Sequence, residues 1–307
     1  MKQANRSSIP VILFAFSANL VIFVIKLVVS FVTRSSALLA EAVHSLADTL
    51  NQVLLIVGIF RARRKPDDLH PFGFSGELYF WSFIVAILLF SAGAVFSIYE
   101  GIHKITNPRE MQNVFWAFLV LIAAIIAEGA AFLKALNRIR REKKERRIME
   151  YLKFCKHSEL IVVFMEDLAA LCGLTMALVF ILLQQITGLL ILDGIASVLI
   201  GALLAVVAFF LARETHSLLI GEAADPRLIR RIASLLADPA VRRVIYIKSL
   251  QLGPEDILLG IKLEFDPGLK APDISRFINR QEEKIRSSFP HVKGIFIEPD
   301  IFIPGRI

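Results

Sequence analysis

Cysteine is scarce in this sequence, which has only Cys155 and Cys172 among its 307 residues. Two cysteines in unrelated contexts cannot form a disulfide framework or a zinc finger, so we expect both to be packing residues. The polar C-terminal part also lacks a nucleophile with an adjacent base, a glycine-rich phosphate loop and an open zinc site with a catalytic carboxylate. These absences argue against an enzyme.

A cleavable signal peptide is missing as well, because the first apolar run continues to about Thr33 without a small-residue cleavage site. This absence and the compact length favour a prokaryotic cell (inner) membrane. The net charge of +7 would fit a nucleic-acid partner, but the basic residues cluster beside apolar runs instead of on one soluble face. Membrane topology explains such clusters, so no nucleic-acid partner is expected.

Apolar residues, in contrast, make up 56% of the chain, and the mean hydropathy is clearly positive. A soluble fold of this length could not bury that much apolar surface, which indicates a multi-pass integral membrane protein in a lipid bilayer. A hydrocarbon core about 30 Å thick needs about 20 helical residues. Segments of that length lie near residues 9–33, 36–60, 78–101, 112–136, 160–184 and 189–212.

The connections between these segments predict how the helices run. Arg34-Ser35 and residues 184–188 leave room only for tight helical hairpins, so neighbouring helices are antiparallel. The stretches 61–65 and 138–147 are strongly basic, whereas the opposite loops hold few basic residues. Because basic loops stay inside, both termini are expected in the cytoplasm, with the 138–147 run as an anchor.

Beyond about residue 220 the composition becomes mixed, which predicts a separate domain. Asp225-Pro226 combines an N-cap with an N1 proline and opens a helix to about Ala237. Alternating residues at 244–248 and 257–265 flank a turn at Gly253-Pro254, a second helix starts at 272–273, and a strand covers 292–297. The predicted fold is an all-α six-helix transmembrane bundle (1–220) followed by a small α+β, αββαβ, half-ferredoxin-like cytoplasmic domain (221–307).

Charged groups at membrane depth are costly unless paired, so each one is a functional candidate. Away from the predicted helix ends they are Lys26, Glu41, His44, Asp48, Glu128, Glu166 and Asp167. Lys26 and Glu41 lie at similar depth, which predicts a structural charge pair. Asp193 and Lys134 lie near helix ends, where we expect them to reach water.

His44 and Asp48 are four residues apart and share one face of their helix, with Asn51 and Gln52 continuing the stripe. At 1.5 Å per residue, Asp48 and Asp167 come to about 12 Å and about 10 Å from the cytoplasmic boundary. The predicted metal site therefore joins these two helices. The alternative is that the aspartates only hydrogen-bond between packed helices.

Glu128 comes to about 6 Å from the same boundary, where it either joins the site or serves as a simple pairing partner. Imidazole and carboxylate ligands suit Zn²⁺ and also Mn²⁺, Fe²⁺ or Co²⁺, and the lack of thiolates argues against Cu⁺. Because such ligands bind metal only when deprotonated, protons and metal would exchange. A site of this kind that faced alternate sides of the membrane would be an exchanger, with the metal as transported ion and H⁺ as counter-ion; no cofactor is expected.

A loop between the second and third segments carries Asp67, Asp68 and His70. This cluster is a candidate for cytoplasmic metal capture, in competition with ordinary turn chemistry.

Three motifs in this order resemble the cation diffusion facilitators: SALLAEAVHSLADTLNQ at 36–52, HPFGFS at 70–75 and EDLAALCG at 166–173. The similarity spans nearly the whole chain and is greatest with the zinc transporter 9-like branch. The resemblance implies a six-helix, proton-coupled exporter, usually a homodimer, whose cytoplasmic αββαβ domain helps dimerisation and can sense metal.

The family's intramembrane site uses two residues four apart on the second helix, which match His44 and Asp48. On the fifth helix it commonly uses a His and an Asp four apart. Asp167 matches that Asp, but Val163 stands at the position of the His.

The resemblance therefore implies that another group completes the coordination. Glu166 is the first candidate, and Asn51, Glu128 or water are the alternatives; Glu-Asp at this point also resembles the zinc transporter 9 branch. The leading hypothesis is zinc efflux by alternating access. The rivals are transport of manganese, iron or cobalt, and a membrane-bound metal sensor or scaffold without transport.

Overall fold

The computed structural model describes residues 4–142, 147–148, 150–151 and 155–305. The chain divides into two compact units, Met1–Gly58 with Phe80–Thr215 and Ile59–Tyr79 with His216–Ile307. The first unit is helical, and the second contains a small sheet.

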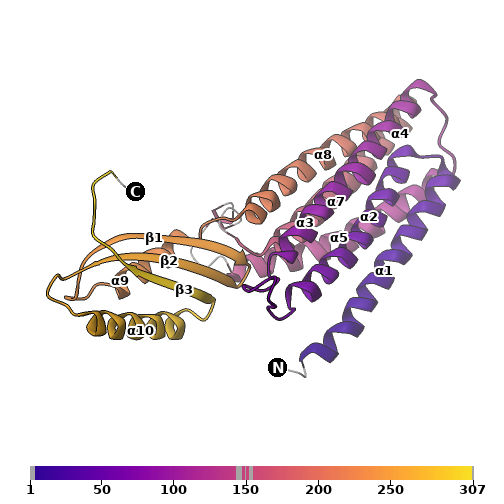
Figure 1. Ribbon diagram of the computed structural model, residues 1–307. Helices are drawn as coiled ribbons and strands as arrows, with labels where there is room; N and C mark the ends of the chain where they lie inside the picture. Colours follow the sequence, from indigo (N-terminus) through magenta and orange to yellow (C-terminus); the bar gives the residue numbers. More distant parts are fainter. Residues whose placement is uncertain (1–3, 143–146, 149, 152–154, 306–307) are drawn as a thin grey trace. The chain divides into compact units, whose positions relative to one another are not determined.

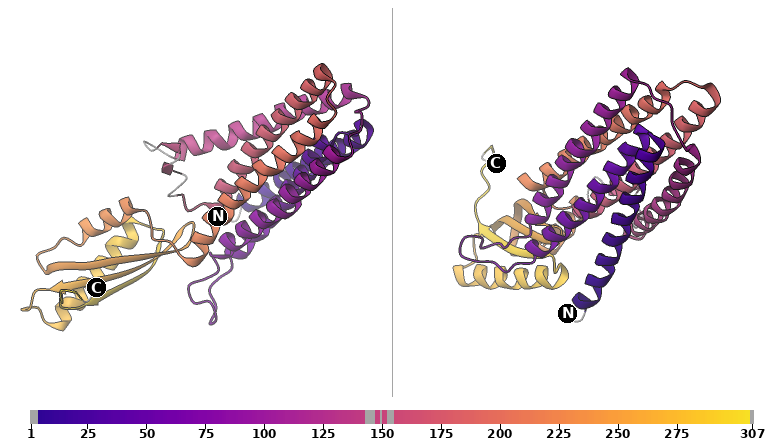
Figure 2. Two further views of the ribbon diagram at one scale, coloured as in Figure 1. Left: turned by 90° about the horizontal axis from the view of Figure 1, so that it is seen from above. Right: turned by 90° about the vertical axis from the view of Figure 1, so that its right-hand side faces the viewer.

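Long helices run side by side in the first unit (Figures 1 and 2). They are α1 (Ala4–Thr33), α2 (Ser36–Ala62), α3 (Glu77–Leu88), the π-helical turn η1 (Leu89–Val95), α4 (Phe96–Thr106), α5 (Val114–Glu142), α7 (Ser158–Thr187) and α8 (Ile191–Ile220). Among the described residues, five helices are long and apolar enough to cross a membrane: Ser36–Ala62, Glu77–Thr106, Val114–Arg141, Ser158–Thr187 and Ile191–Ile220. The apolar part described in α1 is shorter, Asn19–Thr33.

The turns between helices are as tight as the sequence predicts. Arg34 takes a left-handed conformation with φ 56° between α1 and α2. Gly188, with φ 71°, caps the C-terminus of α7, and its N–H donates to the carbonyl oxygen of Gln184. The third predicted segment differs, because it contains the π-helical turn η1, which periodicity does not reveal in a uniformly apolar run. Of the predicted basic run at 138–147, residues 143–146 lie outside the described residues.

Glycines bring α4 and α8 into backbone contact. A Cβ on Gly101 would lie 2.7 Å from the carbonyl oxygen of Gly194, and one on Gly194 would lie 2.8 Å from the carbonyl oxygen of Gly101. Nearby, the Ser197 hydroxyl donates to the carbonyl oxygen of Ser97 at 2.8 Å. The two helices therefore pack as a close pair, as small residues allow in membrane bundles.

We expect Gly101→Ala to lower the free energy of unfolding by about 1–3 kcal/mol, because the new methyl group forces the two backbones apart. Gly129→Ala on α5 is the matched control, since its Cβ would meet nothing closer than Leu171 Cδ1 at 4.0 Å. Both changes gain the same helix propensity, so their difference isolates the close approach. Thermal unfolding in detergent measures it, and equal melting temperatures would contradict the packing.

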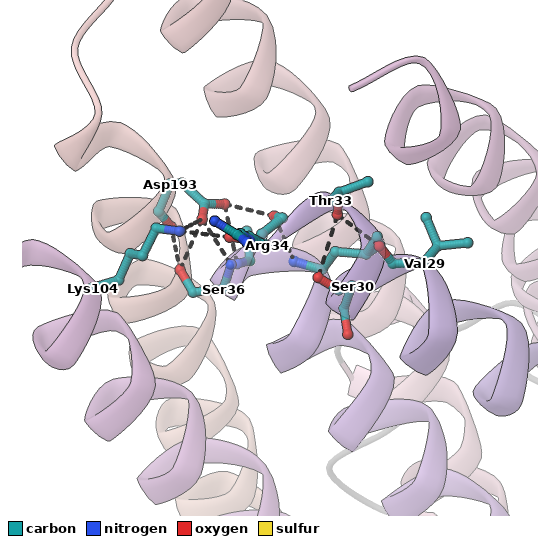
Figure 3. A network of polar contacts seen from close by, with 10 residues as sticks. Val29, Ser30, Thr33, Arg34, Ser36, Lys104 and Asp193 are labelled. Atoms are coloured by element: carbon teal, nitrogen blue, oxygen red, sulfur yellow. Dashed lines mark hydrogen bonds and ion pairs between the residues drawn. The ribbon is translucent and has the colours of Figure 1, made fainter. Parts of the chain in front are cut away.

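Asp193, near the N-terminus of α8, is completely buried, contrary to the expectation that it reaches water. Its carboxylate accepts hydrogen bonds from the Ser35 hydroxyl at 2.6 Å, the Ser36 N–H at 2.7 Å, the Ser36 hydroxyl at 3.1 Å and the Ala37 N–H at 3.2 Å. Lys104 Nζ lies 3.7 Å from it (Figure 3). Asp193 thus caps the N-terminus of α2 from another helix, where a negative charge is favourable. The sequence-based expectation was wrong because it used only the distance of Asp193 from the helix end, and not the neighbouring helices that bury it.

Lys104, at the end of α4, completes this network. Its Nζ donates to the carbonyl oxygen of Arg34 at 2.5 Å, and only 6% of the residue is exposed. The network joins the α1–α2 turn, α4 and α8 (Figure 3). Lys134, in contrast, is exposed.

The second unit holds a three-stranded sheet of order β1-β2-β3. Its elements are α9 (Pro226–Leu235), β1 (Val241–Gly253), β2 (Asp256–Phe265), α10 (Ala271–Ser288) and β3 (Val292–Pro299). β1 and β2 pair antiparallel, and β2 and β3 pair parallel. Every second residue of β2 is buried, and this face packs with Ile232 of α9 and with Phe277 and Ile285 of α10. Both helices therefore cover one face of the sheet (Figure 1).

Candidate metal centre

A cavity of about 40 Å³ lies among four helices of the first unit. It has room for about three water molecules or one partly hydrated ion. Its lining comes from α1, α2, α5 and α7: Asn19, Ile22, Ser45, Asp48, Gln52, Glu128, Val163, Glu166 and Asp167. Four of these residues are carboxylic acids that the sequence places at membrane depth.

Helix α2 carries buried polar atoms, in and next to this cavity, that lack hydrogen-bond partners. They are both ring nitrogens of His44, Oδ1 of Asp48 and Oδ1 of Asn51. His44 Nε2 lies 3.6 Å from Asp48 Oδ2, too far for a good hydrogen bond. Orphaned buried polar atoms are costly, so these atoms on one helix face are candidates for binding an ion.

Glu166 extends the set from α7. It is buried, and its Oε1 accepts a hydrogen bond from Asn51 Nδ2 at 2.5 Å. Because the amide nitrogen is used in this way, the neutral Oδ1 of Asn51 is left without a hydrogen-bond partner. This hydrogen bond joins α2 and α7, the two helices whose aspartates the sequence places at similar depth.

The predicted site residues are only partly assembled. Asp48, Glu128, Glu166 and Asp167 share the cavity, whereas His44 and Asn51 are not part of its lining. Within the part of the chain that the structure describes, no three His, Cys, Asp or Glu side chains already converge as metal ligands. Binding in this cavity therefore requires side chains to turn toward the ion.

Sequence reasoning missed Asn19 and Ser45 as lining residues. Each is a polar residue in a mostly apolar segment, and that signal alone could have marked them. Val163, at the position of the family's His, lines the cavity too.

Lys26 and Glu41 lie next to this cavity. Lys26 Nζ is 3.5 Å from Glu41 Oε2 and donates to the Ser45 hydroxyl at 2.7 Å. Both residues are completely buried. Lys26 and Glu41, which the sequence places at similar depth, are therefore in contact.

The loop of the second unit holds Asp67 and His70 together. Asp67 Oδ1 accepts from the His70 N–H at 2.7 Å and lies 3.0 Å from His70 Nδ1, while the His70 ring packs on Phe74 with centroids 4.4 Å apart. Desolvation would raise the pKa of Asp67, but the hydrogen bonds from His70 lower it below its usual range. Asp68 is exposed. Two of the three residues predicted to capture metal, Asp67 and His70, therefore contact each other within the turn.

The sequence profile described as the cation efflux transmembrane domain matches residues 12–220. The chain therefore belongs to the cation efflux (cation diffusion facilitator) family, and with its apolar helices it is an integral membrane protein. The family's description names cation efflux, and the first relative below is named an antiporter, so both indicate transport.

Relatives place the chain in the zinc transporter 9-like branch, as the motifs predict. It is 35% identical to the proton-coupled zinc antiporter SLC30A9, mitochondrial, of Xenopus laevis, over 83% of this chain and 46% of the relative. It is 30% identical to metal tolerance protein C4 of Arabidopsis thaliana (87% and 59%) and 24% identical to magnetosome protein MamB of Magnetospirillum gryphiswaldense (94% and 93%). The chain thus spans less than half the length of the first of these relatives.

Proposed function

We propose that this protein exchanges a divalent transition-metal ion, zinc in the first place, for protons by alternating access. The observation that carries this proposal is the set of orphaned buried nitrogen and oxygen atoms on α2, next to a cavity that four carboxylic acids line. The relative named as a proton-coupled zinc antiporter supports zinc and protons as the exchanged ions.

In this proposal His44, Asp48 and Asp167 are the primary ligands. Glu166 takes the place of the absent histidine at Val163, because its carboxylate reaches the same cavity from the same helix. Asn51 and Glu128 are further oxygen donors. The metal enters from the cytoplasm, these groups turn toward it, and protons replace it when the site opens outward, since protonated ligands release metal.

We also infer the larger architecture. Residues 1–220 form the transmembrane domain, with α1 as a sixth span, and residues 221–307 form a cytoplasmic half-ferredoxin-like αββαβ domain. Both termini lie in the cytoplasm, the protein is a homodimer in a prokaryotic inner membrane, and Asp67, Asp68 and His70 offer a first contact for incoming metal. The element order α9, β1, β2, α10, β3 supports the domain.

Manganese is the second candidate cargo, because the cavity lining contains four carboxylic acids and no histidine. Such oxygen-rich sites suit Mn²⁺ better than Zn²⁺. Proteoliposomes with an internal pH dye test both, with zinc, manganese, iron and cobalt offered in turn. Zinc flux with proton counterflow supports the proposal. Flux of manganese alone would change the cargo, and silence for every metal in folded protein would favour a sensor or scaffold.

Glu166→Gln is expected to weaken zinc binding on the order of 10- to 100-fold, because it keeps the oxygen that accepts from Asn51 but loses the charge. Adding Val163→His to this variant is expected to restore most of the affinity. Glu159→Gln, in the first turn of the same helix, is the matched control. Competition with a fluorescent zinc chelator measures the affinity. Unchanged binding in Glu166→Gln would remove Glu166 from the ligand set.

A further inference from the structure

Lys26 is a completely enclosed cation on α1. Its only short hydrogen bond among those described is to the Ser45 hydroxyl, at 2.7 Å. An ammonium group has three donors, so one hydrogen bond leaves it under-coordinated in a buried place. The residue that holds it, Ser45, also lines the cavity of the proposed metal site.

Glu41, Ser45 and Asp48 follow each other at intervals of four and three residues, so they share one face of α2. Lys26 is therefore held midway along a stripe with a carboxylate at each end. Asp48, at the cytoplasmic end of this stripe, is a proposed metal ligand. Glu41 lies at the other end.

The contact between Lys26 and Glu41 is loose. Their charged atoms lie 3.5 Å apart, and neither Glu41 oxygen has a hydrogen-bond partner. Glu41 also approaches α7 where Gly173 leaves space, since a Cβ there would overlap its carboxylate. A pair that served only to neutralise itself would be expected to form short hydrogen bonds. This geometry suits a cation that can leave its partner.

We propose that Lys26 is a resident cation that shares the α2 stripe with the transported metal. While metal occupies Asp48, Lys26 stays on Ser45 and Glu41; when metal leaves, Lys26 moves toward Asp48 and replaces part of the lost charge. It acts as a positioning residue, through Asp48, by weakening metal binding enough for release. This inference rests on the proposed function.

The test compares Lys26→Met with the double variant Lys26→Met/Glu41→Gln, which leaves no unpaired buried charge and so guards against misfolding. Zinc affinity is measured on the full-length protein in detergent, and zinc turnover in proteoliposomes. Without the resident charge, both variants are expected to bind zinc about tenfold tighter or more, since a unit charge nearby repels a divalent ion. Turnover is expected to fall at least tenfold. Lys134→Met, which removes an exposed lysine on α5, is the matched control and is expected to change neither quantity.

A purely structural pair makes a different prediction. In that case the double variant regains the affinity and turnover of the wild type, and this result would overturn the proposal, as would unchanged values in both variants. If the wild-type protein binds zinc at Asp48 but does not transport it, the proposed transport function is wrong. The zinc affinities of the variants would still decide the role of Lys26. If the wild-type protein binds no zinc at Asp48, both the proposed transport function and the proposed role of Lys26 are wrong.

Discussion

Asp48→Asn is expected to lower zinc flux at least 100-fold while leaving the protein folded. The substitution keeps the shape of the side chain but removes a charge that lies beside His44 and lines the cavity. A 100-fold loss corresponds to about 2.7 kcal/mol, a modest value for one anionic ligand. Zinc uptake into proteoliposomes measures this effect.

The stability of the same variant distinguishes a binding site from a packing contact. Oδ1 of Asp48 has no hydrogen-bond partner, so the carboxylate costs desolvation without a compensating bond. Asp48→Asn is therefore expected to melt at the same temperature as the wild type or higher. Glu110→Gln, an exposed change in the α4–α5 connection, is the control for both assays. A variant that keeps normal flux, or that unfolds, would show that Asp48 serves the helix packing.

Asp193→Ala is expected to have the largest effect on stability, about 3–5 kcal/mol, because it leaves the buried Lys104 without its anion. The N–H groups of Ser36 and Ala37 at the start of α2 also lose their acceptor. Asp193→Asn keeps one acceptor oxygen and is expected to cost less. Thermal unfolding in detergent measures the difference.

A second substitution separates the charge from the capping. Adding Lys104→Met to Asp193→Ala removes the unpaired cation and is expected to recover part of the loss. The capping part remains, about 1 kcal/mol or more. An Asp193→Ala protein as stable as the wild type would contradict the view that this network holds the α1–α2 turn, α4 and α8 together.

Much of the fold could be predicted from the sequence because apolar length and turn chemistry are local signals. The apolar segments, the tight turns at Arg34 and Gly188 and the three strands all follow from such signals. The membrane helices extend several residues beyond the predicted ends, as α8 does to Ile220, because apolar runs mark the hydrocarbon core and not the helix itself.

The contacts of the candidate site could be predicted only in part, because they depend on which helix faces which. Depth along each helix placed Asp48 and Asp167 at one level, and both line the cavity. The hydrogen bond between Asn51 and Glu166 depends on how α2 and α7 are rotated, which no single-helix pattern contains. Asp193 was misplaced for the same reason, since the partners that bury it come from the α1–α2 turn and α4.

The most direct test of the central claim is the anomalous scattering of zinc in crystals of the zinc-loaded protein. We predict one strong peak within the cavity of the first unit, at bonding distance from Asp48 and Asp167 and from an imidazole nitrogen of His44. The same peak should be missing in Asp48→Asn. A fully occupied zinc at another place, such as the Asp67–His70 loop, with no peak between α2 and α7, would contradict the account.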